Sequence, residues 1–269
     1  MTTMTVARVR PTTLDDDRIT ALAETISLRG ELLRTDEAIA LVGPDGAVVH
    51  GQPGNRMGGL TNLVDNRRGI ADVPPETDQR RLIPAEKAAA IVAELTERLR
   101  LGPTVADGGV KLDVRVDARV TQGVRFDGKE RYAFDAKTDV RTRVFLDGVP
   151  LSGPRAGVSA TFLEDASPVL LAVTTWDAVE AFDEVEVLEK DEVVENLLAA
   201  AKGRRRATPV EIVSASLAYW AGPYEGGADV LEPVWFVEVA HAPAKGEEAG
   251  PHQLVKVAAG VRSARRVAA

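Results

Sequence analysis

The sequence predicts an α+β protein built from two tandem repeats, each a curved antiparallel sheet with a helix packed on one face. Several runs alternate apolar and polar residues with a period of two, which is typical of half-buried antiparallel strands. Two stretches with helical spacing, residues 84–101 and 190–202, interrupt these runs. Strand-like residues 210–220 and 230–241 flank a glycine-rich turn. Strands and helices are therefore mixed along the chain.

The N-terminal part is expected to hold a loose arm followed by a helix. Residues 1–13 show no sustained pattern, and we interpret them as the arm. The sequence LDDD at 14–17 then opens a helix, since acidic side chains are favoured in the first turn. Apolar residues follow at helical spacing, and Gly30 ends this helix.

A hairpin and an irregular segment are expected next. Residues 37–42 and 47–50 are strand-like and flank the sequence GPDG at 43–46, which favours a tight turn. Residues 52–81 are rich in Gly, Asn, Arg and Pro and show little periodicity. We interpret this segment as a mobile surface flap beside an aromatic face.

The helix at 84–101 has the clearest signals in the chain. Pro84 suits a first helical turn, and the sequence GP at 102–103 ends the helix. The strand-like runs after it are 110–120, 132–146, 157–163 and 169–175, with a bend expected near residues 136–137. The second helix at 190–202 precedes the hairpin of residues 210–241, and residues 253–261 form a last strand.

Internal similarity divides the chain. The sequence DGAVVHG at 45–51 recurs as DGVPLSG at 147–153, and helices and strands follow the two copies in a similar order. We therefore predict an N-terminal arm and helix over residues 1–36. A first module is expected over 37–136, and a second module with a C-terminal strand over 137–269.

Each predicted module resembles the PepSY-like modules of bacterial regulatory and propeptide proteins, including the YycI-type two-component regulators. The residues that carry the resemblance are DGVPLSG at 147–153, the strand at 156–163, the helix near 191–201, and LEPVWFV at 231–237. The last of these looks like the L-x-P-V-W strand that ends such modules. The resemblance implies a propeptide-inhibitor or sensor-regulator role.

Composition restricts the possible partners. A net charge of −8 disfavours a nucleic-acid surface, which needs a basic field. The chain has no cysteine, so disulfides and thiolate sites are excluded. No apolar run reaches the roughly 18 residues that a membrane-spanning helix needs, and the N-terminus lacks the apolar segment of a signal peptide. We expect a soluble, cytoplasmic protein, or an exported one if a signal peptide was trimmed.

No motif predicts a cofactor or a metal. The three histidines, His50, His241 and His252, have no second ligand at helical spacing. Phosphate-binding glycine loops and the G-x-S-x-G nucleophile sequence are also missing. The sequence therefore predicts no cofactor and no metal site.

Aromatic residues are the best candidates for a ligand site. Only 4% of residues are aromatic, yet several gather around residues 217–239. Neighbouring residues of a strand point to opposite faces, so Tyr219 and Trp220 cannot both be in the core, and the same holds for Trp235 and Phe236. An exposed ring often marks a binding surface. The predicted ligand-binding residues are Trp176, Tyr219, Trp220, Tyr224 and Trp235.

Carboxylates near these rings could supply an acid or base. Asp177 and Glu225 are the candidates, because apolar neighbours raise the pKa of a carboxyl group. Asp177 belongs to an acidic run up to residue 186, for which a solvated face is the simpler interpretation.

Three classes of function stay open. The first is a non-enzymatic binding or regulatory protein that takes an apolar small molecule or a peptide. The second is a cofactor-free enzyme, such as a cyclase or isomerase, acting on an apolar molecule between the modules. The third is a structural or assembly protein. An enclosed apolar pocket would favour the enzyme, whereas an open sheet surface would favour a protein or peptide partner.

Overall fold

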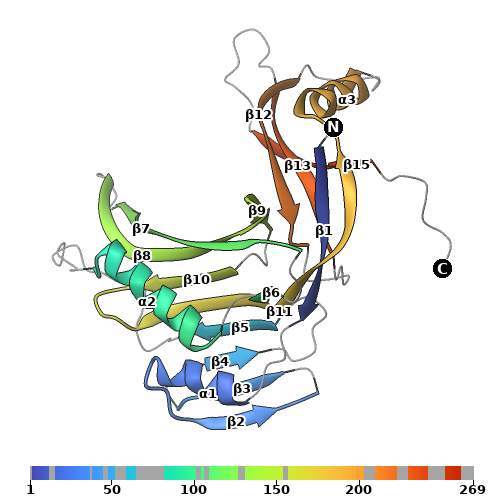
Figure 1. Ribbon diagram of the computed structural model, residues 1–269. Helices are drawn as coiled ribbons and strands as arrows, with labels where there is room; N and C mark the ends of the chain where they lie inside the picture. Colours follow the sequence, from blue (N-terminus) through green and yellow to red (C-terminus); the bar gives the residue numbers. More distant parts are fainter. Residues whose placement is uncertain are drawn as a thin grey trace.

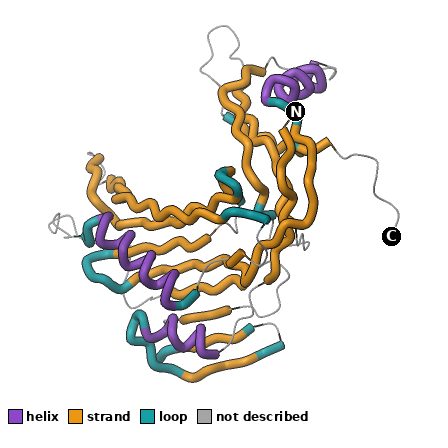
Figure 2. The backbone as a smooth tube through the Cα atoms, in the orientation of Figure 1, coloured by secondary structure: helices purple, strands orange, loops and turns teal. Residues whose placement is uncertain are grey.

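The computed structural model of this protein has an α+β fold dominated by one large sheet. It describes residues 2–11, 16–36, 38–44, 48–51, 59–64, 82–100, 104–105, 109–126, 131–153, 157–202, 210–222, 230–241 and 252–261. Within these residues, three helices accompany a sheet of 15 strands. Figure 2 shows that strands make up most of the described chain and that the helices lie at its outside.

The first half of the chain runs from β1 to β7. Its elements are β1 (Thr2–Pro11), α1 (Asp16–Glu24), β2 (Glu31–Arg34), β3 (Ile39–Val42), β4 (Val48–Gly51), β5 (Gly59–Val64), α2 (Ala85–Arg98), β6 (Thr104–Val105) and β7 (Leu112–Phe126).

The second half runs from β8 to β15. Its elements are β8 (Arg131–Leu146), β9 (Val149–Ser152), β10 (Gly157–Phe162), β11 (Pro168–Val187), α3 (Lys190–Lys202), β12 (Val210–Trp220), β13 (Val230–His241), β14 (Gln253–Ala258) and β15 (Gly260–Val261).

The sheet bends into two halves that share one long strand. In the lower half of Figure 1 the strands follow the order β7-β8-β10-β11-β5-β4-β3-β2, and the upper half holds β12, β13 and β1. β11 belongs to both halves, because it pairs with β10 and β5 near its start and with β1 further along. A strand of 20 residues is long enough to pass through the bend.

Each half has its own core, and a third cluster fills the bend. α1 and α2 pack on the lower half, where Leu22 of α1 and Val92 of α2 belong to one buried cluster. α3 packs on β12 and β13 through Val193. At the bend, Trp176 and Tyr219 lie in a separate buried cluster. Apolar burial in this cluster therefore fixes the angle between the halves.

The predicted α+β class is confirmed, and so are the helices and most strands. The bend expected near residues 136–137 is a β-bulge: Thr121 pairs with Lys137, but Gln122 pairs with Asp135, which leaves Ala136 without a partner. The DG sequence at 147–148 forms the hairpin turn between β8 and β9. Both residues have positive φ, 51° and 82°, as a type I′ turn requires.

Two expectations were wrong. The N-terminal residues do not form a loose arm, because β1 pairs along its length with β11, from Thr2 opposite Val187 to Pro11 opposite Trp176. Its hydrogen-bonding partner lies far away in sequence, so the local pattern gave little sign of a strand. The predicted flap at 52–81 also contains a strand, since β5 lies between β4 and β11. The rest of that segment lies outside the described residues.

The predicted boundary between residues 136 and 137 lies within β8, at its bulge. On both sides of this position a helix is followed by an antiparallel hairpin: α2 by β7 and β8, and α3 by β12 and β13.

Candidate functional site

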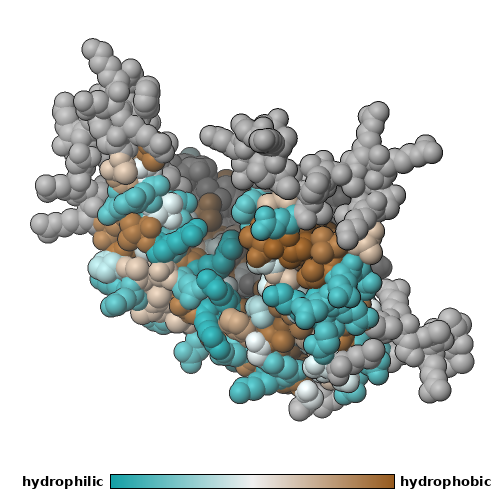
Figure 3. All heavy atoms as spheres, turned by 90° about the horizontal axis from the view of Figure 1, so that it is seen from above, coloured by the Kyte–Doolittle hydropathy of each residue, from teal (hydrophilic) through white to brown (hydrophobic). Residues whose placement is uncertain are grey.

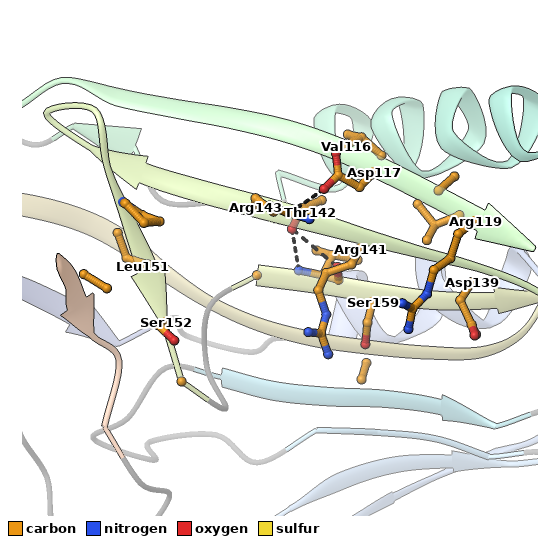
Figure 4. A pocket seen from close by; sticks show the side chains of 18 of the residues that line it. Val116, Asp117, Arg119, Asp139, Arg141, Thr142, Arg143, Leu151, Ser152 and Ser159 are labelled. Carbon is orange, nitrogen blue, oxygen red and sulfur yellow. Dashed lines mark hydrogen bonds and ion pairs between the residues drawn. The ribbon is translucent and has the colours of Figure 1, made fainter. Parts of the chain in front are cut away.

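A groove of about 1310 Å³ lies where the two halves of the sheet meet. Figure 4 shows it from close by, with side chains from β7, β8, β9 and β10 directed into it. Seen from above in Figure 3, the molecule is hollowed, and apolar surface lies beside hydrophilic surface. The lining includes Asp117, Arg119, Asp139, Arg141, Arg143, Leu151, Ser152, Ser159, Thr161, Ser216, Leu217, Phe236 and Leu254.

Strand alternation separates the floor of the groove from the core beneath it. In β8, Val140 and Val144 are buried on one face, whereas Arg141 and Arg143 are exposed on the other. The register places Ser159 of β10 opposite Arg141. The groove floor is therefore a row of polar side chains across neighbouring strands.

Asp139 is the most strongly held carboxylate of the floor. It accepts hydrogen bonds from the hydroxyls of Thr121 at 2.6 Å and Thr161 at 2.8 Å, and Lys137 lies 3.2 Å away. Burial by itself raises the pKa of Asp139, but the hydrogen bonds from Thr121, Thr161 and Lys137 and the lysine charge outweigh it and lower this pKa. Asp139 is therefore ionised at neutral pH.

Of the other charged side chains on the floor, some form ion pairs and some do not. Asp117 forms an ion pair with Arg143. Arg119 and Arg141 line the same groove, yet within the described part of the chain neither guanidinium forms an ion pair or a hydrogen bond.

One wall of the groove is apolar and comes from the hairpin of β12 and β13. Phe236 lines the groove and packs against Trp220, with ring centroids 5.8 Å apart and planes at 58°. The Lys256 ammonium lies 4.2 Å from the Trp220 ring centroid, within the range of a cation–π contact. The groove thus joins a polar floor to an apolar wall.

The alternation predicted for the aromatic residues is confirmed. Tyr219 is fully buried at the bend, and its hydroxyl donates to the Thr5 carbonyl oxygen at 2.7 Å. Trp220 lies on the opposite face, beside Phe236. Trp235 is half-buried on the face that α3 covers, and its Nε1 donates to the Leu188 carbonyl oxygen at 3.1 Å.

The structure does not gather the predicted ligand-binding residues in one place. Trp176 and Tyr219 pack in the bend, Trp235 lies beneath α3, and Trp220 adjoins the groove through Phe236. Tyr224 and Glu225 lie outside the described residues, and Asp177 lies in β11 with its side chain outside the described part. Their roles in binding stay predictions.

The arginines of the floor were missed by sequence reasoning. The signal was present, because Arg119 and Arg141 occupy polar positions of two alternating runs. Alternation alone identifies such residues only as the solvent side of a strand. Pairing β7 with β8, and folding the second hairpin toward them, turns that side into a groove floor.

The described residues contain neither a metal-ligand cluster nor a membrane-spanning helix. No group of three or more His, Asp or Glu side chains gathers there in a way that could hold a metal ion. None of the helices found there has the length and apolar character needed to cross a membrane.

Comparison with known proteins yields a structural likeness alone. No family model matches the sequence, and no curated protein matches it. Among solved structures, the fold is similar to the crystal structure of an uncharacterized protein from Eubacterium rectale ATCC 33656. The TM-score is 0.56 at 14% sequence identity, over 99% of this chain and 87% of that chain. At this identity the likeness concerns the fold.

Proposed function

We propose that this chain is a non-enzymatic binding protein whose groove receives an extended peptide segment of a partner. The observation that carries this proposal is the open groove of about 1310 Å³. Pockets for small molecules usually enclose about 300–1,000 Å³ and cover most of the ligand. This groove is larger, and exposed arginines line its floor. A strand-like peptide would place alternate side chains toward the polar floor.

The groove also suits binding better than the cofactor-free catalysis that the sequence left open. A general acid or base works best with a pKa near the operating pH. Asp139 is a carboxylate of the floor, and its pKa is lowered by its hydrogen-bond donors, which moves it away from that range. An apolar molecule would moreover meet the five charged side chains of the groove floor.

We further propose that the chain consists of two tandem PepSY-like modules with the groove between them. Two observations support this. A helix followed by an antiparallel hairpin occurs on each side of residue 137, and an antiparallel pair precedes each helix, β4–β5 before α2 and β10–β11 before α3. The groove is lined by residues from both sides of that position. This proposal implies a regulatory role, as in the PepSY-like family that the modules resemble.

Selection from a displayed library of random peptides on the immobilised full chain tests the proposed function. Peptides that bind would be measured against two variants. Ser159→Trp places a bulky ring on the groove floor, and we expect it to abolish binding. Leu33→Trp places the same ring on exposed β2, at the far edge of the sheet, and should leave binding unchanged. Thermal melting of both variants would verify that each is folded.

The result that contradicts the proposal is equally specific. A folded Ser159→Trp variant that binds the selected peptides as well as Leu33→Trp does would place their site outside the groove. If no peptide is selected and an apolar small molecule binds instead, the groove is a small-molecule site.

A further inference from the structure

We infer that the groove recognises carboxylate groups of an acidic, extended peptide, and that Arg119 and Arg141 supply the recognition. This inference rests on the proposed function and specifies the chemistry of the partner. Both arginines line the groove and are exposed. In Figure 4 their side chains extend in the same direction, one on each side of Ser159.

The register makes the two arginines diagonal neighbours on one face. Arg119 of β7 lies opposite Asp139 of β8, and Arg141 is two residues further along β8. The backbones of such diagonal neighbours lie roughly 7–8 Å apart, so the ends of two long side chains are within reach of each other. Two guanidinium groups so placed repel each other unless an anion lies between them.

The nearby carboxylates are already engaged elsewhere. Asp117, directly opposite Arg141, forms its ion pair with Arg143. Asp139, directly opposite Arg119, binds Thr121, Thr161 and Lys137. Both acids therefore have other partners, which leaves two arginines on the floor for an external anion.

The charge balance of the groove differs from that of the chain. The lining contains three arginines and two aspartates, whereas the whole chain has a net charge of −8. Scattered solvated arginines are common on sheet surfaces. Here, however, the positive excess of the lining lies on a concave surface, where an approaching anion is attracted most strongly.

The groups beside the two arginines are suited to bind a carboxylate of an extended peptide. The Ser159 hydroxyl lies opposite Arg141 and forms no hydrogen bond to the described residues, so it can donate to the same anion. Guanidinium groups bind carboxylates through two parallel hydrogen bonds. Phe236 and Leu254 line the other side, where apolar side chains of the same peptide would lie. We therefore expect a sequence that alternates acidic and apolar residues.

Fluorescence polarisation with two labelled peptides of equal length tests the inference. One alternates glutamate and leucine, and the other alternates glutamine and leucine, so the two differ in charge alone. We expect the glutamate peptide to bind the wild-type chain about tenfold more tightly, since charge-assisted hydrogen bonds to guanidinium are among the strong ones. Added salt should reduce this preference.

Single substitutions test whether the two groove arginines bind the glutamate side chains. Arg119→Gln and Arg141→Gln should each weaken binding of the glutamate peptide by about tenfold and leave binding of the glutamine peptide nearly unchanged. Arg98→Gln is the matched control, because Arg98 is an exposed arginine in the last turn of α2, outside the groove lining.

Equal affinities of the two peptides, or indifference of the glutamate peptide to either groove arginine, would overturn the inference. These outcomes differ from failure of the proposed function. If library peptides bind and Ser159→Trp abolishes that binding, the groove is a peptide site even when it shows no preference for glutamate. If Ser159→Trp has no effect, both proposals fall.

Discussion

Replacing Tyr219 by phenylalanine tests whether the bend between the two halves is held by a buried hydrogen bond. The change removes one hydroxyl and leaves the ring. That hydroxyl donates to the Thr5 carbonyl oxygen at 2.7 Å and so joins β12 to β1, which lie far apart in sequence. Burial and the nearby charge of Asp147 raise the pKa of Tyr219, so the phenol stays protonated and able to donate.

The expected loss follows from the environment of this bond. Tyr219 is 0% exposed, so the ring keeps its packing in the phenylalanine variant while the carbonyl of Thr5 loses this donor. A hydrogen bond of this kind contributes about 0.5–1.5 kcal/mol. In proteins of about 150–250 residues, each 1 kcal/mol lowers Tm by about 2–4 °C. We therefore expect a fall in Tm of a few degrees.

Thermal melting measured by circular dichroism, beside peptide binding, provides the assay. Ser214→Ala is the matched control, because it removes an exposed hydroxyl that donates to Glu238 at 3.0 Å, and we expect almost no change in Tm. Peptide affinity should be the same in Tyr219→Phe and wild type. Equal melting temperatures of the tyrosine variant and the control would refute the reasoning. Weakened peptide binding with unchanged Tm would instead restore Tyr219 as a ligand-binding residue.

Three further predictions concern charge, backbone and surface. The lowered pKa of Asp139 stabilises the fold above its unfolded pKa of 3.8, and this contribution is lost as pH falls through the lower folded pKa. The difference in Tm between wild type and Asp139→Asn should therefore be largest near neutral pH and shrink in acid; a constant difference would contradict this. Gly153→Ala should destabilise strongly, because Gly153 has φ of 128° and a Cβ there would collide with the Ala221 carbonyl oxygen; a melting temperature like that of wild type would show that this contact is not rigid. Leu254→Ser should weaken peptide binding at little cost in Tm, since Leu254 is 67% exposed and lines the groove; unchanged binding would exclude it from the apolar wall.

Most elements were predictable because their signals are local. The helix at α2 has Pro84 at its start and apolar residues such as Val92 at helical spacing, which bury one stripe. The long hairpin of β7 and β8 alternates on each side of its bulge, since one face of β8 is buried and the other meets solvent. Sequence neighbours within one element decide these features.

Elements whose partners lie far away were missed for the same reason. β1 has a short and uneven pattern, and it is a strand because β11 offers it a hydrogen-bonding ladder. β5 lies between β4 and β11, so its neighbours determine its state more than its own residues do. Intrinsic strand propensity predicts such strands poorly, because hydrogen bonds to distant strands satisfy their backbone groups.

The same division applies to the candidate site. The sequence by itself determined that Tyr219 and Trp220, and likewise Trp235 and Phe236, face opposite sides of their strands, because side chains alternate along any strand. Only the tertiary structure decided which face meets the groove. It also brought Arg119 and Arg141 beside the wall that holds Phe236. Alternation is a property of one strand, whereas a groove is made by strands that meet across a bend, and burial of the Trp176 and Tyr219 cluster sets that bend.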